Sequence, residues 1–164
     1  MEVFRMLPEG TLAEIIDDAL YVHPPPNYFH QQLVMSVGLQ IYPHVKKNKL
    51  GTCLMLPMDV FLDDKTVVLP DILFVTAGKL MLTEDDKIKV TPDLIIEILS
   101  PGKKRYDTEK KKALYEKFGM KEYFIIDPDN KDVMTYYTVN KQFVKQPAAK
   151  GKVKSKLLKK VFSF

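Results

Sequence analysis

The chain has 164 residues and a formal net charge of +4, and 46% of its residues are hydrophobic and 28% charged. This composition is typical of one globular domain, 1–164, and the mild excess of positive charge permits an anionic partner without requiring one. One cysteine excludes a disulfide framework and a cysteine-rich zinc site, and without a signal peptide or a bilayer-length apolar segment we expect a cytoplasmic protein with no membrane partner.

The first third of the chain predicts a hairpin followed by a helix. Residues 11–22 form the hairpin, with an Asp-Asp turn. Asn27 is a suitable N-cap for a helix over 28–42. Pro43 has no backbone N–H to donate, so we expect the helix to end before it.

The middle of the chain predicts four strands. Three of them cover 52–56, 58–62 and 67–75. The polar residues 77–89 that follow are expected to form a loop with a helical turn. The near-continuous apolar run 94–99 is typical of a central strand that is covered on both faces.

A helix and three further strands complete the predicted order. Asp107 is expected to cap a helix over 108–118. A strand follows at 123–126, and residues 133–144 form a hairpin. Strands that bracket a helix in this order are parallel neighbours, so the sequence predicts an α/β or α+β core.

Two carboxylates and one lysine stand out in this pattern. Asp71 follows a proline within a predicted strand, and Glu97 is the one charged residue inside the apolar strand, on the same face as Asp93. Of three consecutive lysines, Lys111 alone lies in the sector of its helix that also holds Leu114. A buried charge without a partner is costly, so an inward lysine and an inward carboxylate require each other or a ligand.

These residues are the parts of a divalent-metal phosphodiesterase site. Mg²⁺ or Mn²⁺ prefers hard oxygen ligands, which Asp71 and Glu97 would supply, and the backbone carbonyl of Ile98 is a further candidate ligand. Lys111 would orient the attacking water or neutralise charge that develops on the phosphoryl group. Alternatively, Lys111 extends along the sheet edge to water, or it forms a structural ion pair with Glu97.

The same residues carry a resemblance to a known family. From about Glu14 to Asp127, the chain resembles the Uma-two family of restriction endonucleases, which belongs to the PD-(D/E)XK nuclease-like superfamily. The matching stretches are Glu14–Leu20, His30-Gln31, Pro70–Ile72, Pro92–Pro101, the spaced Asp107, Lys111 and Tyr115, and Gly119–Pro128.

The resemblance implies an α/β, restriction-endonuclease-like core, in which a central mixed sheet is flanked by helices and carries additional β-hairpins. It also implies a Mg²⁺- or Mn²⁺-dependent endonuclease that hydrolyses DNA phosphodiester bonds, with Asp71 and Glu97 as its acidic residues. The superfamily's lysine normally stands two residues after the glutamate, where this chain has Leu99. Lys111 matches the position to which the family moves that lysine, on the following helix.

Three residues are auxiliary candidates. Asp93 is either a third carboxylate of the site or, because it follows a proline at a strand start, a cap or turn residue. His30 lies on the apolar face of its helix, either as a hydrogen-bonded core histidine or as a group that positions water or phosphate. Glu14 matches a family position from which the first hairpin would approach the metal. His23 precedes a run of prolines and is expected to be exposed.

The end of the chain is rich in lysine, with Lys145, Lys150, Lys152, Lys154, Lys156, Lys159 and Lys160. These residues would either follow a phosphate backbone or form a solvated tail. We expect DNA as the partner and a homodimer that cuts both strands. The alternative function is a catalytically inactive nucleic-acid-binding or assembly module of the same fold, and a third class is a nuclease that acts on RNA or single strands.

Overall fold

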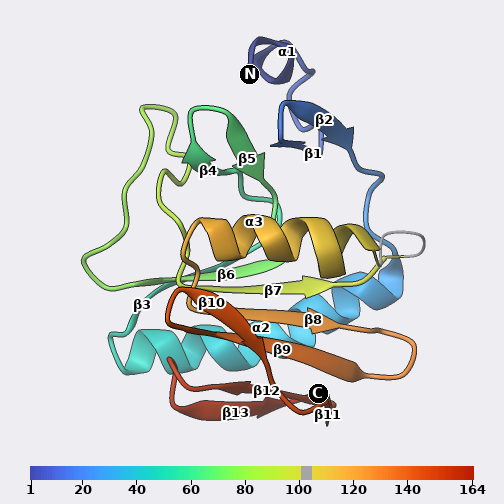
Figure 1. Cartoon of the computed structure of the whole chain (residues 1–164), viewed down its shortest axis with the longest axis vertical. Coiled ribbons are helices and arrows are strands. Elements are labelled where there is room, and N and C mark those ends of the chain that lie inside the picture. The colour runs from blue at the N-terminus through green and yellow to red at the C-terminus, as the bar shows by residue number, and fades with distance from the viewer. Residues whose placement is uncertain (101–104) are drawn as a thin grey trace.

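The computed structural model describes residues 1–100 and 105–164, and a large mixed sheet lies at its centre (Figure 1). The strand order of this sheet is β10-β9-β8-β7-β6-β3, and β11 pairs with β9. Its strands are β3 Gly51–Met55, β6 Ile72–Thr76, β7 Leu94–Ile98, β8 Glu122–Ile126, β9 Asp132–Val139, β10 Gln142–Lys145 and β11 Ala149–Lys150. Pro101, which belongs to one of the matching stretches, lies outside the described residues.

A smaller antiparallel sheet lies beyond one edge of the large one, in the order β2-β1-β5-β4. Its strands are β1 Ala13–Ile16, β2 Ala19–Val22, β4 Val60–Asp63 and β5 Thr66–Val68. The predicted hairpin over 11–22 is confirmed, because β1 pairs with β2 and both aspartates of the turn have a positive φ. A short helix, α1 Glu2–Arg5, precedes this sheet and buries no residue.

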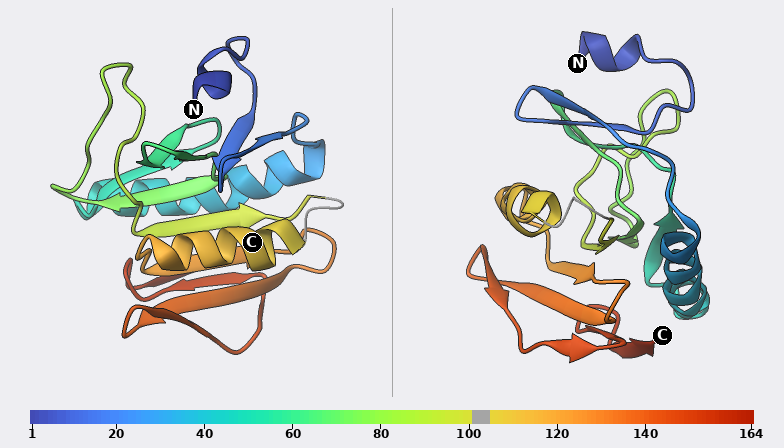
Figure 2. Two further views of the ribbon diagram at one scale, coloured as in Figure 1. Left: turned by 45° about the horizontal axis from the view of Figure 1, so that its top comes forward. Right: turned by 90° about the vertical axis from the view of Figure 1, so that its right-hand side faces the viewer.

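Helices cover both faces of the large sheet (Figure 2). On one face, α2 Tyr28–Lys47 packs against the β7 side chains Leu94, Ile96 and Ile98. On the other face, the π-helical segment η1 Tyr106–Lys111 and α3 Lys112–Lys117 pack against Ile95 and Leu99. The two-sided burial predicted for this strand is therefore confirmed. No helix in the described parts of the chain is both long and apolar enough to span a bilayer.

Helix α2 begins where the sequence predicts and ends later. The side chain of Asn27 accepts a hydrogen bond from the His30 N–H at 2.9 Å, so the predicted N-cap is confirmed. The prediction that Pro43 ends the helix is wrong, since the helix continues to Lys47. Val45, on the turn after the proline, is buried in the core, and this packing offsets the hydrogen bond that a proline nitrogen cannot donate.

The strand predicted over 67–75 is in fact two strands that belong to different sheets. β5 ends at Val68, and β6 begins at Ile72. Between them, the Leu69 N–H donates to the side chain of Glu14 at 2.8 Å, and Pro70 has no N–H to give to a neighbouring strand. Asp71 therefore lies at the junction of the two sheets.

The segment 77–89, which is described throughout, contains isolated bridges in place of the predicted helical turn. Ile88 bridges to both Val60 and Leu82, and it is almost fully buried. The Phe61 N–H donates to the Ile88 carbonyl at 2.8 Å. This apolar anchor holds the polar loop in an extended form against the small sheet.

The predicted parallel pair that brackets a helix is confirmed. β7 and β8 are parallel, with Ile96 opposite Phe124, and η1 and α3 connect them. The predicted start of the helix is wrong, because η1 begins at Tyr106 and its N-cap is Arg105, which makes no side-chain capping bond. Asp107 is instead a buried residue of the first turn.

The lysine-rich end of the chain is folded. β12 Lys152–Ser155 and β13 Lys160–Ser163 form an antiparallel hairpin, and its inward side chains Val153, Leu158 and Phe162 belong to the same core as α2. The interpretation of this segment as a solvated tail is therefore wrong. Apolar residues between the lysines secure the hairpin to the body of the protein.

Replacing Phe162 with alanine is expected to lower the free energy of unfolding by about 3–5 kcal/mol, because the ring is fully buried. Urea denaturation followed by circular dichroism measures this loss. Val161→Ala, one residue away but 46% exposed, is the matched control and should change stability by less than about 0.5 kcal/mol. Equal effects of the two substitutions would contradict the packing of the hairpin described above.

Cys53, the one cysteine of the chain, lies on β3 and is buried. Burial raises the pKa of its thiol to about 12. The thiolate is the reactive form of cysteine, so this side chain acts as a small apolar core residue.

Candidate active site

The sheet register brings the two predicted carboxylates together. β6 and β7 are antiparallel, with Ile72 opposite Ile96, so the residue before β6 lies beside the end of β7. Asp71 uses this position: its Oδ2 accepts a hydrogen bond from the Ile98 N–H at 2.7 Å. The same oxygen accepts a second hydrogen bond from His30 Nε2 at 3.0 Å. His30 is thus a hydrogen-bonded, buried histidine that fixes the carboxylate of Asp71 from α2.

Lys111 contacts Glu97 directly, as the periodicity of the two elements predicts. The Nζ atom of Lys111 lies 2.9 Å from Glu97 Oε1, and both side chains are almost fully buried. Tyr115, one turn farther along the helix, donates its hydroxyl to the same oxygen at 2.8 Å. Lys111 does not extend to water along the sheet edge, so that alternative is wrong.

Glu14 enters the site from the small sheet and contacts the same lysine. Its Oε1 lies 2.9 Å from Lys111 Nζ and also accepts the Leu69 N–H. Its Oε2 accepts hydrogen bonds from the Tyr106 hydroxyl at 2.9 Å and from His23 Nε2 at 2.7 Å. Each carboxylate oxygen of Glu14 therefore has two polar contacts, and this side chain connects the small sheet to the large one.

The π-helical form of η1 places several of these groups on one side. A π-helix closes its hydrogen bonds between residues five apart, so Tyr106 and Lys111 lie above one another. Asp107 is also turned inward, with Oδ1 3.9 Å from Lys111 Nζ. Such segments are frequent at functional sites.

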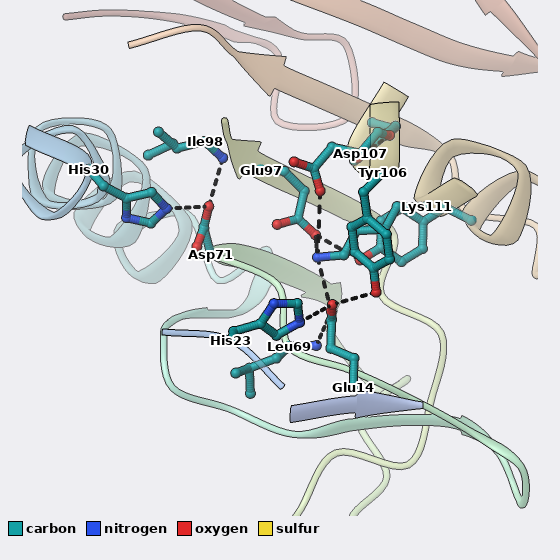
Figure 3. A network of polar contacts seen from close by, with 12 residues as sticks. Glu14, His23, His30, Leu69, Asp71, Glu97, Ile98, Tyr106, Asp107 and Lys111 are labelled. Atoms are coloured by element: carbon teal, nitrogen blue, oxygen red, sulfur yellow. Dashed lines mark hydrogen bonds and ion pairs between the residues drawn. The ribbon is translucent and has the colours of Figure 1, made fainter. Parts of the chain in front are cut away.

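The polar groups surround one open pocket of about 320 Å³. Figure 3 shows the carboxylates of Asp71 and Glu97 side by side, with Lys111 between Glu97 and Glu14. The charged and titratable residues that line the pocket are Glu14, His23, His30, Asp71, Glu97, Tyr106, Asp107 and Lys111. The prolines after β2 and the residues Ile98 and Ser100 complete its wall. Four carboxylates thus face a single lysine in the described part of the pocket.

Asp71 and Glu97 each keep one oxygen that has no partner among residues 1–100 and 105–164. In Asp71 the two hydrogen bonds fall on Oδ2, and in Glu97 both fall on Oε1. Within the described residues, Asp71 Oδ1 and Glu97 Oε2 accept no hydrogen bond. The second oxygen of Glu97 is on the side that faces Asp71 (Figure 3). Two fixed carboxylates therefore offer free oxygens to the same pocket.

The excess of negative charge shifts the pKa values of the site. Burial raises the pKa of Glu97 well above its ordinary value. The positive charge of Lys111 acts in the opposite direction, and the negative charges of Asp71, Asp107 and Glu14 raise the pKa further. Burial also opposes the charge of Glu14, but Lys111, His23 and the Leu69 N–H together lower its pKa to about 2. The pKa of Lys111 is raised although burial acts against its charge, because Glu14 and Glu97 surround it. Lys111 is therefore a permanent cation at neutral pH.

Asp93, the third carboxylate considered from the sequence, does not line the pocket. It precedes β7, at the end of the strand opposite to Glu97, and its Oδ2 accepts the Thr76 N–H at 2.9 Å. Its Oδ1 lies 3.0 Å from Lys79 Nζ and 2.9 Å from Lys121 Nζ. Asp93 thus ties together three segments around the start of β7, which agrees with the cap or turn role.

Sequence reasoning missed His23, Tyr106 and the inward side chain of Asp107. His23 is half-buried against Glu14, so the expectation that it is exposed is wrong. Tyr106 meets Glu14 across 92 positions of sequence. No local pattern marks these residues, because their partners depend on how the small sheet is placed.

Replacing Glu14 with glutamine is expected to cost on the order of 3 kcal/mol of stability at pH 7. Folding lowers the pKa of Glu14 from 4.5 to about 2, so its ionised form stabilises the protein above about pH 4.5, and this contribution is lost as the pH falls toward 2. Urea denaturation of both proteins at several pH values between 7 and 3 measures the difference, which should shrink with acidity. The exposed Glu9→Gln serves as the control, and a difference that is independent of pH would contradict this interpretation.

Comparisons with known proteins agree with this architecture. A solved structure of a "putative nuclease belonging to DUF820" from Anabaena variabilis superposes with a TM-score of 0.71 at 23% sequence identity, over 90% of this chain and 81% of that chain. This likeness establishes the fold. None of the curated proteins matches the chain. The model of the Uma2 family, described as "Putative restriction endonuclease", matches residues 1–159. Because the match covers almost the whole sequence, the chain belongs to the Uma2 family of restriction endonuclease-like proteins.

Proposed function

We propose that this protein is a divalent-metal-dependent endonuclease that hydrolyses DNA phosphodiester bonds. The observation that carries the proposal is the pair of free carboxylate oxygens, Asp71 Oδ1 and Glu97 Oε2, in one pocket beside the cation Lys111. The family and the fold support a nuclease. DNA as the substrate and metal dependence are the parts that the proposal adds.

The donor set fits Mg²⁺ or Mn²⁺. These ions take oxygen ligands and commonly use only one or two carboxylates together with several waters. In the described residues no group of three or more histidine, cysteine, aspartate or glutamate side chains has a metal-holding arrangement, so the proposed ion would rest on the two carboxylates, a backbone oxygen and water. The Ile98 N–H points at Asp71, and N–H and C=O groups of one strand residue point to the same side. The Ile98 carbonyl is therefore the proposed third ligand.

A bound divalent cation would supply Lewis acidity and a water of lowered pKa. The residues of the chain contribute position and charge. His30 and the Ile98 N–H hold Asp71 by one oxygen, while Lys111 and Tyr115 hold Glu97 by one oxygen. Because Lys111 remains protonated, it is suited to neutralise charge on a phosphoryl group or to orient water, and it is not a general base. The prolines after β2 restrict the mobility of one pocket wall.

A plasmid-nicking assay tests the proposal. The wild-type protein with Mg²⁺ or Mn²⁺ is expected to cleave supercoiled DNA to open-circular or linear product, and EDTA should stop the reaction. Glu97→Gln should slow nicking on the order of 100-fold or more, because it removes the negative charge that faces Lys111 and replaces one of the two carboxylate oxygens with an amide nitrogen that cannot bind a metal. Equal rates for wild type and Glu97→Gln would identify a contaminant or another site.

The proposal includes a homodimer, since one pocket of this size acts on one strand at a time. Linear product that forms without accumulation of open circles would support paired sites, and a strictly monomeric enzyme that only nicks would contradict them.

A second candidate function is a catalytically inactive nucleic-acid-binding or assembly module. The observation that favours it is the ion-pair cluster of Lys111 with Glu14 and Glu97, which is complete without a metal. Absence of both Mn²⁺ binding and nicking in well-folded protein would favour this function over the endonuclease.

A further inference from the structure

The positive charge of the chain is concentrated at its C-terminal end. Residues 133–164 contain eight lysines and no aspartate or glutamate, whereas residues 1–132 contain 17 basic and 21 acidic residues. The net charge of +4 is therefore the sum of a basic end and an acidic body. Protein surfaces ordinarily mix the two signs, so a segment of this length with one sign only is informative.

The fold turns this segment into a rigid basic surface. Side chains alternate along β12, so Val153 and Ser155 point into the protein, and Lys152 and Lys154 point out. Opposite them on β13 are Ser163 and Val161, neither of which carries charge. We call the outward side of β12, with Lys152 and Lys154, the lysine face.

Three more exposed lysines belong to the same hairpin. Lys156 and Lys159 belong to the turn between β12 and β13, and Lys160 begins β13. Lys156 extends over the ring of Tyr137, with Nζ 4.2 Å from the ring centre.

The exposed lysines of the hairpin form no close ion pair in the part of the chain that the structure describes, although the charge of Lys156 acts on the buried carboxylate of Glu122. Within the described residues, Lys152, Lys154, Lys156, Lys159 and Lys160 make no ion pair. Some lysines elsewhere on the surface do have acidic partners: Lys79 and Lys121 pair with Asp93, and Lys112 pairs with Glu116. Lys152 and Lys154 on the lysine face are therefore not paired with an acidic side chain of the described residues.

The hairpin is also fixed in place. Glu122 on β8 accepts the Ser155 hydroxyl at 2.6 Å and the Leu157 N–H at 2.8 Å. Tyr137 donates its hydroxyl to the Lys154 carbonyl. A charged surface that is already ordered loses little conformational entropy when a partner binds, which distinguishes this hairpin from a flexible lysine tail.

We propose that the lysine face binds the phosphate backbone of a nucleic acid, as a contact surface separate from the pocket. The identity of the polymer rests on the proposed function, because a nuclease of small size needs contacts that retain the substrate beyond the scissile phosphate. A lipid surface fits less well, since Val161 is the only large, exposed hydrophobic side chain of this hairpin among the described residues. Backbone contacts of this kind are independent of base sequence and are weakened by salt.

Fluorescence anisotropy of a labelled DNA duplex, measured in EDTA between about 50 and 200 mM salt, tests the inference without any need for catalysis. Lys152→Gln combined with Lys154→Gln is expected to weaken binding about tenfold at low salt. It should also reduce the slope of log K against log salt by about 2, roughly one per lysine. The effect should be the same for duplexes of unrelated sequence.

Lys65→Gln combined with Lys89→Gln is the matched control. It removes the same charge from exposed positions, of which Lys65 is in the β4–β5 turn at the opposite end of the molecule (Figure 1). The control should leave the salt slope within measurement error of wild type. Equal losses in the two double variants would overturn the inference, because the effect would then reflect net charge alone. Equal melting temperatures of all variants establish that none is misfolded.

Two further outcomes separate this inference from the proposed function. If wild type nicks DNA and the lysine-face variant binds DNA as tightly as wild type, the inference is overturned and the endonuclease stands. If DNA binding depends on the lysine face but no metal gives nicking, the inference stands and the endonuclease fails. Binding to vesicles of anionic lipid that depends on Lys152 and Lys154, without such dependence for DNA, would overturn the inference in favour of a membrane.

Discussion

Replacing Lys111 with methionine is expected to lower the free energy of unfolding at pH 7 by about 3–5 kcal/mol, because it leaves two buried carboxylates without their cation. Without that cation, the folded state would bury Glu14 and Glu97 favourably only in their protonated, uncharged forms. The loss should therefore shrink as the pH falls from about 4.5, the ordinary pKa of Glu14, toward about 2, its pKa in the folded wild-type protein, because the wild type loses the stabilisation by this ion pair over that range. Urea denaturation at several pH values measures this dependence.

The same substitution is expected to lower the rate of metal-dependent nicking on the order of 100-fold or more, because the cation beside the pocket is lost. Stability and activity are separated by assaying nicking at low temperature, where the variant is folded by circular dichroism.

The chain supplies its own control for this prediction. Lys112 adjoins Lys111 but points about a quarter turn away, where it is half-buried and pairs loosely with Glu116 at 3.6 Å. Lys112→Met removes the same charge from the same helix and should cost less than about 0.5 kcal/mol, the worth of an exposed helical ion pair. If Lys112→Met and Lys111→Met had equal effects on stability and nicking, net charge rather than the buried cluster would explain both.

Replacing Asp71 with asparagine is expected to weaken Mn²⁺ binding at least 100-fold. Loss of a partner that merely supports a metal ligand commonly costs 10–100-fold, so loss of a ligand should cost more. The reason is specific to the carboxylate: asparagine keeps the shape and one oxygen but has no charge, and its amide nitrogen cannot bind a metal. Isothermal titration calorimetry or electron paramagnetic resonance with Mn²⁺ measures the change.

Asp93→Asn is the matched control for Asp71→Asn. Both aspartates follow a proline, both are buried, and both precede a strand of the large sheet. Asp93 lies outside the pocket and is held by Lys79 and Lys121, so its replacement should reduce stability and leave Mn²⁺ binding intact. Retained Mn²⁺ binding in Asp71→Asn would remove Asp71 from the site, whatever its effect on nicking.

The contrast between these two aspartates shows how far the sequence alone can lead. Each has the same local signal, a proline followed by an acidic residue and an apolar run. Only the antiparallel register of β6 and β7 separates them, because it places Asp71 next to the end of β7 that carries Glu97 and Asp93 at the other end. Register depends on side-chain packing across the whole sheet and is not written in any short segment.

Glu97 and Lys111 were predictable because each interrupts a periodic apolar pattern. A period of two places Glu97 inside the protein, and a period of 3.6 does the same for Lys111, so their contact follows once the helix is packed on the strand. Tyr115 belongs to the same apolar sector, but nothing in its own sequence context says that its hydroxyl binds Glu97.

The C-terminal hairpin was missed although its sequence alternates. Lys-Val-Lys-Ser-Lys has the period of a strand with one buried face, yet the high lysine content suggested either a solvated tail or a segment that follows a phosphate backbone. The hairpin is held to the protein by hydrogen bonds to Glu122 and Tyr137, which belong to strands earlier in the chain. Helix α2 presents a similar case, since the burial of Val45 outweighs the local tendency of Pro43 to stop a helix.

The inert thiol of Cys53 makes this chain convenient for distance measurements. Because the one native cysteine is buried and its pKa is raised to about 12, maleimide reagents should leave it unmodified in the folded protein. A cysteine introduced at an exposed position would then carry a spin label or a fluorophore alone. Labels placed on β12 and on the hairpin of β1 and β2 would report whether the two ends of the molecule approach one another when a polymer is bound.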